Sequence, residues 1–120
     1  RDSIRRQRQM CIRDSCYPWK LFDLGTKKEL PILEIPLIVQ DTAMLNPSKG
    51  MRLDSKMALR YMIQIAAEVE KVGGVLTLLW HPNEIIHRES WTLYLKILNY
   101  LRDKNAWITS LQEVGDWWLR

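Results

Sequence analysis

The sequence lacks several patterns that mark common classes of protein. No run of eighteen apolar residues is present, so the sequence predicts no membrane-spanning helix. It contains no CxxC, HExxH or HxxxH metal-site pattern, no GxGxxG or GxxxxGK[ST] phosphate-binding loop, and no GxSxG motif of serine hydrolases. Only two cysteines occur in 120 residues, which gives neither a disulfide framework nor an indication of the redox compartment.

The excess of positive charge is confined to the start of the chain. The formal net charge is +4, but residues 1–15 alone contain five arginines and two aspartates. The remaining residues contain 13 basic and 12 acidic side chains. Residues 16–120 therefore give no electrostatic reason to expect binding to nucleic acid or to an anionic membrane.

The first fifteen residues differ from the rest of the chain and repeat a tripeptide, since Arg-Asp-Ser occurs at 1–3 and again at 13–15. Residues 5–14 resemble the translation of a transposon-type sequencing adapter, because CGT CGG CAG CGT CAG ATG TGT ATA AGA GAC encodes RRQRQMCIRD. We therefore expect residues 1–15 to be adapter-derived and to form no part of the natural fold. The natural sequence before Cys16 is then expected to be missing.

Residues 16–120 have the alternating pattern of an α/β fold. Hydrophobic residues make up 47% of the whole chain and charged residues 27%, as in globular proteins. Apolar runs predict strands at 30–39, 75–80 and 106–109, with irregular segments at 16–29 and 40–54. Helices are expected to begin at Asp54 or Ser55, at Ser90 and at Ser110. Repeated βα units predict a parallel sheet, but three strands are too few for a closed barrel.

The two longer helices are each expected to bury one apolar stripe. For the first helix the expected stripe is Ala58, Tyr61, Met62, Ile65, Ala66, Val69 and Val72, and Gly73-Gly74 is expected to end it. For the second helix the expected stripe is Trp91, Tyr94, Leu95, Leu98 and Leu101. Ser110 and Glu113 form a capping-box pattern at the start of the last helix.

Two polar side chains are expected at the carboxyl edge of the sheet, where α/β proteins concentrate function. Asp41 follows the first predicted strand, and His81 follows the second. A carboxylate beside a histidine orients the ring and stabilises its protonated form, which suits general acid–base catalysis. The alternative is structural, with His81 hydrogen-bonded to a loop and Asp41 capping a turn.

Other reactive residue types have simpler interpretations. His87 is expected in an exposed loop, because a metal site with His81 needs a third ligand. Cys16 is expected to be a small buried hydrophobe. Trp117 and Trp118 could form a sugar platform, although tryptophans at the end of a helix more often cover a core.

Four segments resemble the C-terminal part of polysaccharide deacetylases, the carbohydrate esterases of the chitin-oligosaccharide and peptidoglycan deacetylase type. They are CYPWKLFDL (16–24), LPILEIPLIVQD (30–41), GGVLTLLWHPN (73–83) and AWITSLQEVGDWW (106–118). Their order and spacing match across essentially all of residues 16–120. The most specific element is the apolar strand ending in Leu-Trp-His, because the family has a catalytic histidine after Leu-x-His, which corresponds to His81.

The resemblance implies a distorted (β/α) barrel of which this chain holds an incomplete C-terminal part. The family binds one divalent metal, usually zinc, through an Asp and two His in Thr-Phe-Asp-Asp-like and His-x-x-x-His-like motifs. Neither motif is present here. The resemblance therefore implies zinc in the complete parent, no metal ligand in this chain, and no activity of the chain by itself.

The implied reaction is hydrolysis of an acetamido group on a carbohydrate. In this interpretation His81 is the general acid that protonates the leaving amine, and Asp41 is its partner. Tyr17, Trp19 and Trp80 are expected to line the substrate groove. The alternative is a non-catalytic carbohydrate-binding or scaffold relative with the same fold. The sequence does not indicate a cellular location.

Overall fold

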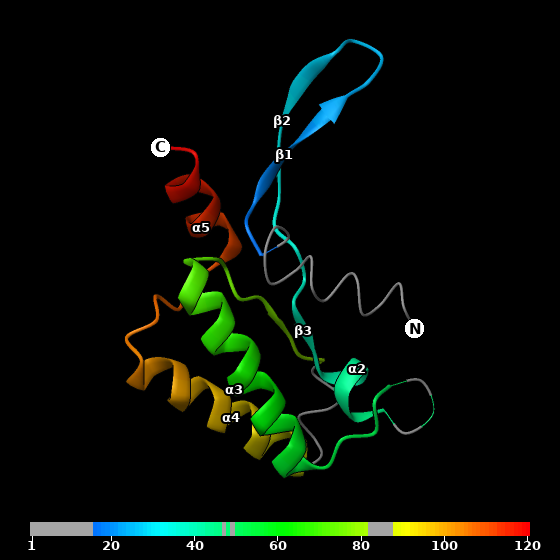
Figure 1. Cartoon of the computed structure of the whole chain (residues 1–120), viewed down its shortest axis with the longest axis vertical. Helices are drawn as coiled ribbons and strands as arrows, with labels where there is room; N and C mark the ends of the chain where they lie inside the picture. Colours follow the sequence, from blue (N-terminus) through cyan, green and yellow to red (C-terminus); the bar gives the residue numbers. More distant parts are fainter. Residues whose placement is uncertain (1–15, 47, 49, 82–87) are drawn as a thin grey trace.

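The structure, a computed structural model, describes residues 16–46, 48, 50–81 and 88–120. Its strands are β1 (Trp19–Asp23), β2 (Lys28–Glu34), β3 (Val39–Gln40) and β4 (Leu78–Leu79). Its helices are α2 (Asp41–Leu45), α3 (Ser55–Val72), α4 (Arg88–Asp103) and α5 (Leu111–Trp118). Strands β1 and β2 form an antiparallel hairpin, and β3 and β4 form a separate parallel pair (Figure 1).

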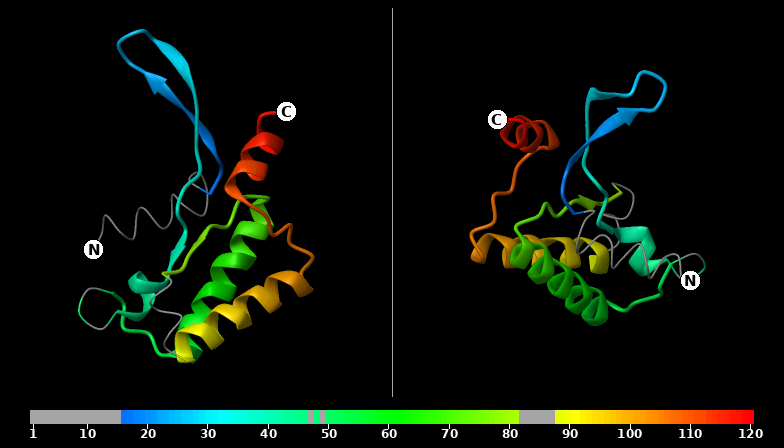
Figure 2. Two further views of the ribbon diagram at one scale, coloured as in Figure 1. Left: turned by 180° about the vertical axis from the view of Figure 1, so that it is seen from behind. Right: turned by 45° about the horizontal axis from the view of Figure 1, so that its top comes forward.

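The core lies between the parallel pair and two helices. Helices α3 and α4 lie side by side, whereas the β1–β2 hairpin projects away from them (Figures 1 and 2). The buried cluster draws residues from β3, α2, α3 and α4, namely Val39, Met44, Ala58, Met62, Leu93 and Ile97. The end of β3 and the start of α2 are thus attached to the best-packed part of the described chain.

Helix α3 forms where the sequence predicts it. The Asp54 carboxylate accepts a hydrogen bond from the Met57 backbone N–H at 2.8 Å, which caps the first turn. Gly73 ends the helix in the left-handed conformation, with φ of 68°. The buried residues Ala58, Met62, Ala66 and Val69 all belong to the predicted apolar stripe. This helix confirms the prediction of both its ends and its buried face.

The predicted strand at 30–39 is divided into two. Its first half pairs with β1, and only Val39 and Gln40 pair with β4. Pro36 has no N–H to donate, and its carbonyl instead accepts a hydrogen bond from the Thr77 hydroxyl at 2.6 Å. Thr77 also accepts the backbone N–H groups of Ile38 and Val39. The hydrogen bonds of Thr77 therefore replace part of the strand ladder and hold residues 36–39 beside the segment that precedes β4.

Several other predicted elements were wrong. Residues 16–29 contain β1 rather than only irregular chain, and the predicted loop at 40–54 contains α2. Residues 106–109 form no strand, since Trp107 and Ile108 lie in an exposed segment without a pairing partner among the described residues. The errors at 16–29 and 106–109 concern pairing with a distant segment, which a local pattern does not specify.

The buried face of α4 also differs from the prediction. Its buried residues are Ser90, Leu93 and Ile97, whereas Trp91 and Leu95 are exposed. The helix begins at Arg88, so Ser90 lies in its first turn rather than at its cap. Apolar residues cover a broad arc of α4, wider than one stripe, and packing against α3 selects which part of this arc is buried.

In the described chain β3 and β4 form a parallel pair, and α3 lies between them in the sequence, as expected for βα units. A complete barrel stays an expectation from the resemblance. None of the described helices is both long enough and apolar enough to cross a membrane.

Candidate active site

Asp41 begins α2 at the carboxyl end of β3. The side chain is fully buried, although an isolated buried carboxylate is strongly disfavoured. Its Oδ1 accepts the Thr42 backbone N–H at 2.7 Å, and its Oδ2 accepts the His81 backbone N–H, also at 2.7 Å. Burial with these partners fixes the carboxylate in one orientation, as a precise catalytic group requires.

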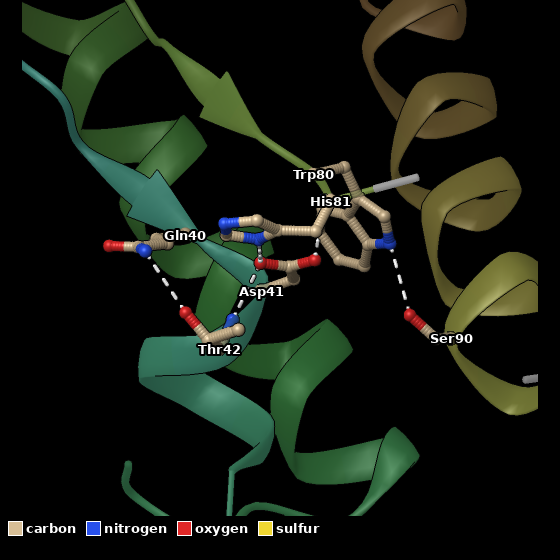
Figure 3. Close-up of polar contacts among 6 residues, drawn as sticks. All are labelled: Gln40, Asp41, Thr42, Trp80, His81 and Ser90. Atoms are coloured by element: carbon tan, nitrogen blue, oxygen red, sulfur yellow. Dashed lines mark hydrogen bonds and ion pairs between the residues drawn. The ribbon is translucent and has the colours of Figure 1, made fainter. Parts of the chain in front are cut away.

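His81 follows β4 by one residue and lies against Asp41. Its Nδ1 is 2.6 Å from Asp41 Oδ1, and Figure 3 shows the ring pointing toward the carboxylate. The two residues meet because β3 and β4 are parallel and paired up to Gln40 and Leu79, so both strands end at one edge. The sequence predicts this meeting at the carboxyl edge, and the structure brings the two side chains into contact.

The pair has the geometry of an oriented acid–base histidine. When the carboxylate is ionised it can only accept hydrogen bonds, and Nδ1 is then the donor in this contact. The other nitrogen, Nε2, points away from Asp41 (Figure 3). About 38% of the His81 side chain is exposed, whereas that of Asp41 is fully buried. The arrangement suits proton transfer at Nε2 while the carboxylate holds the ring at Nδ1.

Comparisons of the chain with family models, curated proteins and solved structures gave no match. The functional interpretation of the site therefore rests on its residues and geometry and on the resemblance described above.

The three predicted groove residues are not gathered at this pair. The Tyr17 hydroxyl donates to the Val72 carbonyl at the end of α3, and its ring lies 6.0 Å from that of Trp118. Tyr17 is thus near the chain that leads into β4, while His81 lies beyond the other end of that strand. Trp19 is an exposed residue of the hairpin strand β1.

Trp80 is adjacent to His81 in sequence, but its indole points to the other side. The indole N–H donates to the Ser90 hydroxyl at 3.0 Å, and the ring lies 5.3 Å from that of Tyr94. Both partners belong to α4, on the side opposite the His81 ring (Figure 3). The sequence does not predict Ser90 as a neighbour of the site. It predicts that Ser90 caps a helix, and a cap position does not indicate a hydrogen bond with Trp80.

The remaining predicted residues have the following positions. Cys16 is completely buried, as expected for a small hydrophobe. His87 lies outside the described residues. Within the described ranges no three His, Cys, Asp or Glu side chains are grouped as metal ligands would be. The described residues therefore do not fit a zinc centre by themselves.

An aromatic surface lies away from the Asp41–His81 pair. The rings of Tyr17, Trp118, Trp117 and Trp107 follow one another at centroid distances of 6.0, 6.1 and 6.3 Å. A shallow depression of about 560 Å³, largely open to solvent, is lined by Gly73, Trp117, Trp118 and Arg120. Trp117 and Trp118 are thus partly packed and partly exposed. This position is intermediate between a sugar platform and a pair of side chains that cover a core.

Proposed function

We propose that this chain supplies the general-acid histidine of a carbohydrate N-deacetylase, the hydrolase suggested by the polysaccharide-deacetylase resemblance. The observation that carries the proposal is the 2.6 Å contact between His81 Nδ1 and the buried Asp41 carboxylate. A histidine that only filled the core would need neither a fully buried carboxylate as its partner nor a side chain that is 38% exposed. The site chemistry thus favours proton transfer over the structural alternative.

His81 acts when the carbon–nitrogen bond of the acetamido group breaks. In its protonated form it donates the Nε2 proton to the leaving nitrogen, while Asp41 holds Nδ1–H and stabilises the positive charge beforehand. Water supplies the oxygen of the released acetate, and the sugar leaves as the amine.

The proposal is tested on the product of the source gene, whose reading frame is first read across the Cys16 codon on long DNA molecules. Acetate release from N-acetylglucosamine oligosaccharides is measured for wild type, His81→Ala and Gln64→Ala. His81→Ala should lower kcat about a hundredfold or more, the usual scale for a general acid. Gln64 is exposed on α3 and serves as the control. Unchanged turnover in His81→Ala would remove His81 from the mechanism.

The second candidate is a non-catalytic carbohydrate-binding relative, which the aromatic surface favours. Trp117 is 54% exposed beside the depression, and exposed aromatic groups commonly mark binding surfaces. In this case the same oligosaccharides would quench tryptophan fluorescence without releasing acetate. Trp117→Ala would then abolish the quenching, whereas His81→Ala would leave it intact. Acetate release by the wild type decides for the hydrolase.

A further inference from the structure

We infer that Trp80 is a positioning residue, which fixes His81 through the hydrogen bond from its indole N–H to the Ser90 hydroxyl. The inference rests on the proposed function of His81 as a proton donor. It assigns Trp80 a place behind the catalytic histidine rather than on the substrate side. The two partners come from different elements, the end of the β4 segment and the first turn of α4.

His81 needs such support because the parallel ladder ends before it. Strand β4 contains only Leu78 and Leu79, and its last paired residue is Leu79. Beyond this point the His81 backbone N–H bonds to Asp41 Oδ2 at 2.7 Å. The Trp80 indole bonds to α4 on the other side. The peptide between Trp80 and His81 is therefore held from two directions, by α2 and by α4.

The contact with α4 is well built. Ser90 is 4% exposed, so its hydroxyl is shielded from water and has reason to keep a protein partner. Tyr94 lies one turn further along α4, on the same helix face as Ser90, and packs against the Trp80 ring at 5.3 Å. The hydrogen bond to Ser90 fixes the rotation of the Trp80 indole, and the ring contact with Tyr94 limits how closely the indole approaches α4.

Loss of the hydrogen bond should disturb His81 more than it disturbs the fold. Catalytic geometry is sensitive to small displacements, since an error of about 1 Å can cost about a hundredfold in rate. The packing of Trp80 on Tyr94 survives in a variant that removes only the hydrogen bond. We therefore expect an effect of about tenfold on kcat, comparable to the loss of a supporting contact in other sites.

The direct test follows His81 by nuclear magnetic resonance in the 120-residue chain. The variants are Trp80→Phe, Ser90→Ala and the double variant, with Thr92→Ala as the control because Thr92 is exposed on the same helix. In Ser90→Ala the Trp80 indole proton should exchange with solvent about tenfold faster. The Nδ1 proton signal of His81 should weaken, and the ring nitrogen shifts should move toward a mixture of tautomers. Thr92→Ala should match wild type.

The double variant tests whether the two residues act through each other. If they do, Trp80→Phe/Ser90→Ala should resemble Trp80→Phe alone in its His81 signals, because the bond is already absent. Trp80→Phe keeps an aromatic ring on Tyr94 and decides the question if Ser90→Ala does not fold. Wild-type His81 signals in Ser90→Ala, together with faster indole exchange, would overturn the positioning role.

The kinetic test separates this inference from the proposed function. In the natural full-length protein, Ser90→Ala should lower kcat about tenfold and leave KM within about twofold, since it misplaces the acid without touching substrate. If wild type releases no acetate, the proposed function fails, while the resonance comparison still decides whether Trp80 positions His81. If His81→Ala is inactive and Ser90→Ala has full kcat, only the positioning role fails.

Discussion

The two small sheets in the described part of the chain are stabilised in different ways. The hairpin has the longer pairing, with β2 alone covering seven residues, yet Phe22 and Ile32 are about half exposed. The parallel pair has only two residues in each strand, yet it is backed by α3 and α4 and holds a fully buried carboxylate. An isolated two-stranded hairpin is marginally stable at best in water. The comparison teaches that the order of the site comes from the helices and polar contacts around it, not from the length of its ladder.

The largest expected difference between the two regions is the cost of removing an apolar side chain. Met62 lies on α3 with no exposed surface, whereas Ile32 on β2 is 52% exposed. Met62→Ala should lower the free energy of unfolding by about 2–5 kcal/mol, because it leaves a cavity in the core. Ile32→Ala should cost about 0.5 kcal/mol or less, as is usual for surface positions. Urea denaturation of both variants measures the difference, and equal losses would show that the hairpin is packed against another surface.

The next largest difference concerns two glycines, Gly25 in the turn of the hairpin and Gly50 in the chain that follows α2. A Cβ on Gly50 would lie 2.8 Å from the Ala43 carbonyl oxygen and closer still to that of Thr42, both on the backbone of α2. A Cβ on Gly25 would meet only the Asp23 side chain, at 3.3 Å. Gly50→Ala should therefore cost about 1–3 kcal/mol through steric overlap, while Gly25→Ala should stay within about 0.5 kcal/mol.

The glycine pair also tests how α2 supports the site. The chain after α2 donates two hydrogen bonds back toward the helix, from the Gly50 N–H to the carbonyl of its C-cap Asn46 and from the Met51 N–H to the carbonyl of Ala43. Displacing this turn should shift Asp41 at the start of the same helix and weaken the Nδ1 proton signal of His81. Gly25→Ala is the control for that signal. An unchanged His81 signal in a folded Gly50→Ala variant would show that Asp41 is placed by β3 alone.

The part of the fold that the sequence could predict is the part specified by local chemistry. Asp54 and Gly73 mark the ends of α3 through a side-chain cap and a left-handed backbone, and neither needs a distant partner. The Asp41–His81 contact could be anticipated because parallel strands end at one edge, so two residues that follow such strands become neighbours.

The parts that could not be predicted depend on which segment pairs with which. The apolar run at 30–39 does not say that Pro36 divides it between an antiparallel and a parallel partner. The run at 106–109 has strand-like residues but no partner in the described chain. In α4 the residues at 90, 93 and 97 are buried instead of the expected stripe, because periodicity cannot choose between two apolar faces.

The smallest predicted effect lies in the turn of the hairpin and is a pH effect. The pKa of the Asp23 carboxyl is lowered, first by the hydrogen bond from the Thr26 hydroxyl and then by the Gly25 backbone N–H. Because the pKa is lower in the folded hairpin, the ionised carboxylate stabilises the turn. This stabilisation is fully present when the pH is above the pKa of Asp in the unfolded chain, about 3.9. This contribution is lost as the pH falls through the folded pKa, so the turn should loosen only in acid.

Thr26→Val removes the larger cause and keeps the smaller one. The pKa of Asp23 should therefore rise part of the way toward its ordinary value, and the turn should loosen at a higher pH than in wild type. Carboxyl carbon shifts of Asp23 followed between pH 2 and 6 give the titration, and backbone shifts of the turn report the loosening. The Nδ1 proton signal of His81 should be the same in both proteins at every pH of that range. A joint change would mean that the hairpin and the parallel pair are coupled, contrary to the independence that their separate sheets indicate.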